Sequence, residues 1–118
     1  MAEFLGPVHL AEAEVTRHVP AGVPGAFALG HARPQEGAVF ISFVGRSDTD
    51  LRSTVLAHVG SHYTACFYLP LRSPSDAYAE ECRLWHEMGA GELDSADHPV
   101  PPGDHPCTAS AANAPASR

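Results

Sequence analysis

Apolar residues are unevenly spread along this chain and gather between residues 27 and 88. Two short apolar runs, residues 25–30 and 38–45, are joined by a polar loop, and this pattern predicts a β-hairpin. The second run is nearly continuous in β-branched and aromatic residues, as expected of a central strand that is covered on both faces. A third run, residues 61–71, predicts a further strand.

Three segments carry the signals of helices. Residues 7–18 place one proline near the start and another just beyond the end. Residues 46–60 repeat apolar positions at helical spacing, with Ser47 or Asp48 as the expected N-cap and a glycine at the end. Residues 73–89 begin with a serine cap followed by proline and end at glycine, which makes this helix the clearest of the three.

These elements predict an α/β fold, with a small three-stranded antiparallel or mixed sheet flanked by helices. The length of 118 residues allows one domain with one core. We expect an N-terminal helical segment over residues 1–21, a core over residues 22–97, and a tail rich in proline and alanine over residues 98–118.

The chain is acidic, with a formal net charge of −7 at pH 7 and no lysine. The excess concentrates in residues 71–97, where two arginines oppose seven carboxylates. Proteins that grip a phosphate backbone usually present a basic stripe, so nucleic acid is not an expected partner. No apolar stretch approaches the roughly 18 residues of a membrane span, and no signal peptide is evident. We therefore expect no membrane association and a cytoplasmic location.

The three cysteines are an odd number in a chain without a secretion signal, so a disulfide framework is not expected. Cys82 and His86 are spaced i, i+4 on one side of the last predicted helix, and further candidate ligands follow in the tail. A structural zinc site would use Cys82, His86, His98 and Cys107, which are residue types that zinc prefers. The competing interpretation is a buried Cys82 beside a stacked or exposed His86, because the spacing is not that of a standard zinc motif.

Two polar residues interrupt the apolar faces of the predicted helices. Glu81 lies between Ala77 and Trp85 on the apolar face of the last helix, and a buried carboxylate is costly unless it is paired. It is therefore either a member of a structural ion pair, or a metal ligand or general base at the floor of a cleft. His58 lies on the apolar face of the preceding helix and is either a core histidine or an acid/base group.

Four motifs, taken in order, resemble the GIY-YIG nuclease superfamily. Gly-Ala-Phe at residues 25–27 takes the place of the first motif, and Phe-Val-Gly at residues 43–45 takes the place of the second. The helical segment over residues 46–58 corresponds to the motif-bearing helix, and the helix that carries Glu81 corresponds to the one with the family's acidic metal ligand. The resemblance covers roughly residues 22–107, and the motifs look particularly like those of small bacterial members of the family.

Much of the catalytic signature that the resemblance implies is replaced. In active members two tyrosines, an arginine and a metal-binding glutamate surround the scissile phosphate. The tyrosine positions correspond to Phe27 and Phe43, and the arginine position corresponds to Thr54, whereas Glu81 and His58 match. Loss of one transition-state donor typically costs about 10²–10³ in rate. Because two hydroxyls and a guanidinium are missing together, we expect nuclease activity to be lost.

The preferred interpretation is a scaffold repurposed as an enzyme that acts on a small molecule without a cofactor. Glu81 and His58 would form an acid/base pair, and Arg46 or His62 would orient the substrate. The remaining substrate-binding residues would be Phe27, Phe43, Thr54 and Tyr63. We expect an isomerisation, cyclisation, hydrolysis or ring-opening step, of the kind found in bacterial specialised metabolism.

Two alternatives stay open at this point. A non-catalytic module would bind a partner through the same cleft or through the acidic surface. A residual nuclease would need Mg²⁺ at Glu81 and substitutes for the missing groups. Those substitutes would be Arg46 or Arg52 for the arginine, and Tyr63 or His62 for a tyrosine.

Overall fold

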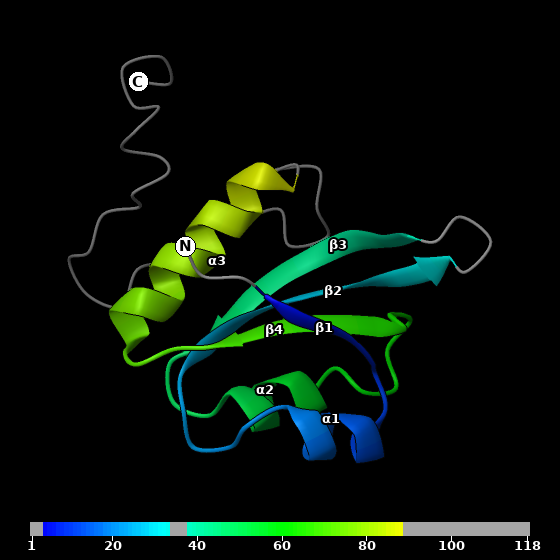
Figure 1. The fold of residues 1–118 in the computed structure, drawn as a ribbon, viewed down its shortest axis with the longest axis horizontal. Coiled ribbons are helices and arrows are strands. Elements are labelled where there is room, and N and C mark those ends of the chain that lie inside the picture. The colour runs from blue at the N-terminus through cyan, green and yellow to red at the C-terminus, as the bar shows by residue number, and fades with distance from the viewer. Residues whose placement is uncertain (1–3, 34–37, 89–118) are drawn as a thin grey trace.

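The computed structural model describes residues 4–33 and 38–88, which form a four-stranded sheet and three helices (Figure 1). The strands are Leu5–His9 (β1), Gly25–Arg33 (β2), Ala38–Ser47 (β3) and Ala65–Pro70 (β4), and the helices are Glu12–His18 (α1), Leu51–Leu56 (α2) and Pro74–Glu87 (α3). The predicted α/β class is confirmed, and all strand pairs are antiparallel in the order β1-β4-β2-β3. In this part of the chain no helix has the length and apolar character needed to cross a membrane.

The β2–β3 hairpin forms where the two apolar runs predict it. However, β2 and β4 are the strands with neighbours on both sides, and β3 ends the strand order of the described sheet. The expectation that residues 38–45 form a central strand is therefore wrong. Their apolar character has another cause, because Phe43 packs against one core cluster and Val44 belongs to the other. Continuous hydrophobicity thus reports that both faces of a strand are covered, and not where the strand lies in the sheet.

The N-terminal segment contributes the fourth strand, so the prediction of a three-stranded sheet is wrong. The helix predicted over residues 7–18 is confirmed only for Glu12–His18. β1 pairs with β4, and the helix starts only at Glu12. Pro7 lacks an N–H, which suits an edge strand as well as the first turn of a helix. The spacing of Val8 and Leu10 favours the strand, because residues two apart point to the same side of an extended chain and both are buried here.

Side-chain caps fix the residues at which α2 and α3 begin. Ser73 Oγ accepts a hydrogen bond from the N–H of Asp76 at 3.1 Å, as its sequence predicts. The N-cap of α2 is Asp50, so the prediction of Ser47 or Asp48 is wrong. Ser47 Oγ instead accepts a hydrogen bond from the N–H of Asp50 at 2.9 Å, which holds the turn that leads into the helix.

Helices α1 and α2 cover one face of the sheet, and α3 covers the other (Figure 1). We call these the α1/α2 face and the α3 face. The larger core cluster lies on the α1/α2 face and consists of Val8, Leu10, Val15, Val19, Phe27, Leu29, Leu51, Val55, Tyr63, Cys66 and Tyr68. The cluster on the α3 face is smaller, with Ala28, Val44, Leu84 and Trp85 as its buried members. Since residues from the N-terminal segment belong to the larger cluster, that segment shares one core with the rest of the described chain.

Candidate functional site

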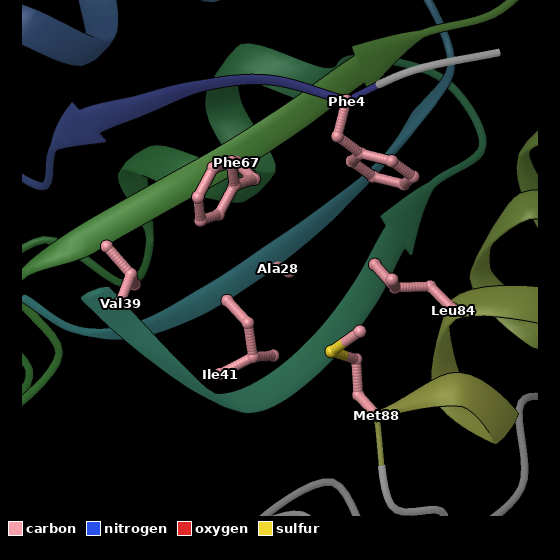
Figure 2. A pocket seen from close by; sticks show the side chains of 7 residues that line it. All are labelled: Phe4, Ala28, Val39, Ile41, Phe67, Leu84 and Met88. Carbon is pink, nitrogen blue, oxygen red and sulfur yellow. The ribbon is translucent and has the colours of Figure 1, made fainter. Parts of the chain in front are cut away.

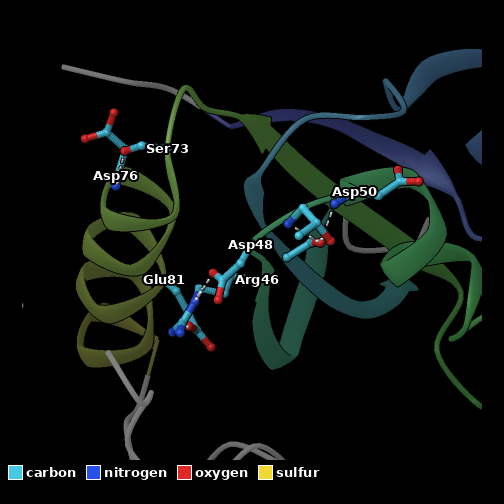
Figure 3. Close-up of polar contacts among 8 residues, drawn as sticks. Arg46, Asp48, Asp50, Ser73, Asp76 and Glu81 are labelled. Atoms are coloured by element: carbon cyan, nitrogen blue, oxygen red, sulfur yellow. Dashed lines mark hydrogen bonds and ion pairs between the residues drawn. The ribbon is translucent and has the colours of Figure 1, made fainter. Parts of the chain in front are cut away.

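Glu81 is a buried residue of α3 and forms an ion pair with an arginine of β3. Its side chain is only 12% exposed, and Arg46 Nη1 donates a hydrogen bond to Glu81 Oε1 at 2.8 Å (Figure 3). Arg46 Nε donates a second hydrogen bond, also 2.8 Å long, to Asp48 Oδ1. The guanidinium lies 5.3 Å from the centre of the Tyr78 ring, within range of a cation–π contact. One arginine therefore bridges two carboxylates and an aromatic ring.

The electrostatics of this group are dominated by burial. Burial raises the pKa of Glu81, and the hydrogen bond and charge of Arg46 oppose this shift without cancelling it. Burial alone would lower the pKa of Arg46, but hydrogen bonds to Asp48 and Glu81 raise it above its ordinary value. Arg46 is thus a fixed positive charge, and Glu81 is a carboxylate whose ionised form depends on that charge.

The α1/α2 face holds a cluster of aromatic rings around His58. The centre of the His58 ring lies 5.6 Å from that of Phe27 and 5.0 Å from that of Phe43. Burial lowers the pKa of His58, since the charged imidazolium is disfavoured next to apolar rings. Phe27 is 1% exposed, and a Cβ placed at Gly45 would lie 2.7 Å from its Cζ. Glycine at position 45 therefore leaves the space that the Phe27 ring occupies.

The sheet separates the residues that we expected to line one cleft. Phe27 pairs with Gly45 across the hairpin, and Ala26 pairs with Arg46. Since successive residues of a strand point to opposite faces, Arg46 and its partner Glu81 lie on the α3 face, opposite the Phe27 ring. The expectation of a single cleft shared by His58 and Glu81 is therefore wrong.

The other candidates for the lost nuclease groups are engaged in local structure. Thr54 Oγ1 donates a hydrogen bond to the backbone oxygen of Asp50 at 3.1 Å, within its own helix. Arg52 Nε donates to the backbone oxygen of Val19 at 2.7 Å and so ties α2 to the end of α1. Neither interaction positions these side chains beside Glu81.

His62 and Tyr63 extend the aromatic cluster, together with a histidine that sequence reasoning missed. The ring centres of His62 and Tyr63 are 4.2 Å apart, and Tyr63 lies 5.9 Å from Phe43. The His31 ring lies 5.4 Å from that of His62 and 5.7 Å from that of Tyr63. The signal for His31 was present, since it follows Phe27 by four residues in a strand and so points to the same face.

The candidate zinc ligands are only partly described. Cys82 is fully buried and disulfide-bonded, although the sequence predicted no disulfide framework, and a disulfide sulfur is not a thiolate ligand. The His86 ring packs edge-on against Trp85, with ring centres 4.9 Å apart. His98 and Cys107 lie outside the described residues. Among the residues that are described, no three His, Cys, Asp or Glu side chains form a group that could hold a metal ion.

A pocket of about 350 Å³ opens on the α3 face, and sequence analysis did not predict it. Every lining residue is apolar, and together they come from β2, β3, β4, α3 and the residue before β1: Phe4, Ala28, Val39, Ile41, Phe67, Leu84 and Met88 (Figure 2). No single segment supplies more than two of them. The pocket exists because α3, which covers this face in the described part of the chain, leaves the side chains of β2, β3 and β4 that line it open.

These features define a four-stranded antiparallel α/β domain whose two faces carry different side chains. No protein-family model, no curated protein and no solved structure matches this chain.

Proposed function

We propose that this chain is a binding domain on a GIY-YIG-like scaffold and that it does not cleave nucleic acids. The observation that carries the proposal is the buried ion pair between Arg46 Nη1 and Glu81 Oε1, 2.8 Å long. Glu81 is the carboxylate on which both a metal-dependent nuclease and the expected acid/base pair would rely. Here one of its oxygens is committed to a guanidinium, and the sheet lies between it and His58.

The surroundings of Glu81 do not favour a divalent metal ion. A cation bound to its carboxylate would be repelled by the positive charge of Arg46, and this repulsion is strong where water is largely excluded. Mg²⁺ prefers carboxylates that can approach it together with several waters. The phenol and guanidinium groups of an active nuclease are also missing, with phenylalanine at positions 27 and 43 and threonine at position 54. The net charge of −7 disfavours a phosphate backbone in addition.

Acid/base catalysis centred on His58 alone is the second candidate. The lowered pKa of His58 favours a neutral imidazole at pH 7, which is the form that can accept a proton. The nearby rings of Phe43 and Tyr63 would suit an aromatic or apolar substrate. Such an enzyme would lose turnover in His58→Gln and keep it in Glu81→Gln, which is the reverse of the pattern expected for an enzyme that uses Glu81.

Cleavage assays test the proposal directly. Supercoiled plasmid and short DNA and RNA oligomers are incubated with the full chain in Mg²⁺ or Mn²⁺, beside Glu81→Gln. We expect no cleavage by either protein. We also expect Mg²⁺ to change Tm no more than NaCl of matched ionic strength, since no metal is bound at Glu81. Cleavage by the wild type that disappears in Glu81→Gln would overturn the proposal.

A triple reversion tests the separation of the two faces. Phe27→Tyr, Phe43→Tyr and Thr54→Arg together restore the residue types of an active member. We expect the folded revertant to remain inactive, because its new groups lie on the α1/α2 face and Glu81 lies on the other. Metal-dependent cleavage by the revertant would mean that these groups meet in one site.

A further inference from the structure

The pocket on the α3 face is lined by apolar side chains that come from several elements. Figure 2 shows them arranged around Ala28, with Phe4 and Phe67 on one side and Leu84 and Met88 on the other. Ala28 is 1% exposed and forms part of the floor, while Met88 is 40% exposed and stands at the rim. The site therefore has a fixed floor and an adaptable edge, because methionine is unbranched and changes rotamer easily.

We propose that this pocket binds a small, uncharged, apolar molecule. The inference rests on the proposed binding function and names the site and the class of ligand. A volume of about 350 Å³ lies at the lower end of the range for small-molecule pockets. At roughly 30 Å³ per water-sized unit it accommodates about a dozen non-hydrogen atoms. A medium-length alkyl chain or a single substituted ring has this size.

Charge decides against an ionised ligand. None of the seven lining side chains can donate a hydrogen bond to an anion or pair with it. Arg46, a partly buried cation on the same face, already bonds to Asp48 and Glu81. The chain as a whole is acidic, which opposes the approach of a further negative charge. A neutral molecule avoids the cost of burying an unpaired charge.

The chain carries its own reporter of occupancy. Trp85 is the single tryptophan, and it is buried in the same cluster as Ala28 and Leu84, against which Phe67 also packs. A molecule that enters the pocket changes the packing of this cluster and therefore the emission of Trp85. Methyl resonances of Ile41, Leu84 and Met88 provide an independent map, because all three residues line the pocket.

The test compares two probes that differ in charge. The full chain is titrated with 1-octanol and with octanoate at pH 7.5, and Trp85 emission and methyl chemical shifts are followed. We expect saturable binding of 1-octanol, with shifts concentrated at the lining residues. Octanoate should bind at least about tenfold more weakly, because its carboxylate finds no partner.

Two substitutions locate the site and have matched controls. Ala28→Leu fills the floor and should weaken 1-octanol binding by about tenfold or more. Met88→Lys places a cation at the rim and should shift the preference towards octanoate by about tenfold, since an ammonium pairs with a carboxylate. Leu5→Ser and Leu5→Lys are the controls. Leu5 is 49% exposed and does not line the pocket, so neither variant should alter either affinity.

Several outcomes would overturn the inference. One is the absence of saturable 1-octanol binding to the full chain. Another is equal affinity for octanoate, and a third is methyl shifts confined to the α1/α2 face. If Ala28→Leu does not fold, the preference of Met88→Lys decides alone. Failure here is distinct from failure of the proposed function, which is judged by nucleic-acid cleavage and Mg²⁺ dependence.

Discussion

On the α1/α2 face, the sheet residues Phe27 and Leu29 are at most 1% exposed and share one core cluster with residues of α1 and α2. The α3 face is covered by one helix and holds a buried ion pair and an apolar pocket. Both faces use the same strands, with alternate residues directed to each side. The first face therefore buries more apolar side chains, whereas the second leaves an open pocket.

The two faces also give the candidate site residues a different role from the one that the sequence predicts. Phe27, Phe43 and His58 were expected to line a binding cleft, but they pack against one another. The pocket that does exist is lined by residues without catalytic groups. Predictions about the two faces can therefore be tested separately, since sites on opposite sides of a sheet that share no partner should behave almost additively.

The same truncation on each face should have the largest and most unequal effect. Leu51→Ala removes a fully buried side chain and should lower the free energy of unfolding by about 4 kcal/mol, whereas Leu84→Ala should cost about 2 kcal/mol. Leu84 is 8% exposed and borders an existing pocket, so its removal enlarges an open space and does not create a sealed cavity. Urea unfolding of both variants measures the two values. Equal losses would mean that the faces are packed equally well.

The next effect concerns the ion pair on the α3 face. Glu81→Ala leaves the partly buried guanidinium of Arg46 with one carboxylate partner and should cost about 3 kcal/mol. The control is Glu80→Ala, which breaks a more exposed pair with Arg83 on the same helix and should cost less than about 1 kcal/mol. Thermal and urea unfolding compare the two. Similar losses would show that the contact between Arg46 and Glu81 is not effectively buried.

A smaller loss is expected at the hairpin, on the α1/α2 face. Gly45→Ala places a Cβ 2.7 Å from Cζ of the buried Phe27 ring and should cost about 2 kcal/mol. Phe27→Leu shortens the side chain that the new methyl group meets. In that background the added cost of Gly45→Ala should fall by about half, which a double-mutant cycle measures. A cost that is unchanged would place the strain elsewhere.

The smallest effect is a pH dependence that differs between the faces. The folded pKa of His58 lies below 6.5, so as the pH falls below 6.5 the unfolded chain binds a proton that the folded chain does not. Stability contributed by neutral His58 is therefore lost until its folded pKa is reached. The raised pKa of Glu81 acts in the opposite sense, because the folded state takes up that proton more readily as the pH falls.

Urea unfolding between pH 7.5 and pH 5 isolates the contribution of His58. His58→Phe keeps a ring of similar shape and should flatten the decline in stability. His9→Gln, at an exposed position on β1, should leave the decline as it is in the wild type. If His58→Phe declines as steeply as the wild type, the pH dependence arises from other groups.

Local features of this fold were predictable because their signals lie within a few residues. The cap at Ser73 depends on a contact with Asp76, and the β2–β3 hairpin depends on two adjacent apolar runs. The burial of Glu81 was also predictable, since helical spacing places it among apolar neighbours. At Pro7 two local signals compete. The proline predicts the start of a helix, but the alternation of buried and exposed residues places it in the strand β1.

The sequence by itself determined the β2–β3 hairpin, the start of α3, and that Glu81 would be buried and need a partner or a function. Only the tertiary structure decided that the partner is Arg46, which is 35 residues away, and that His58 lies on the opposite face. The pocket likewise depends on how five separate segments meet. Periodicity specifies which side chains share a face of one element, but the pairing of those faces is set by packing over the whole chain.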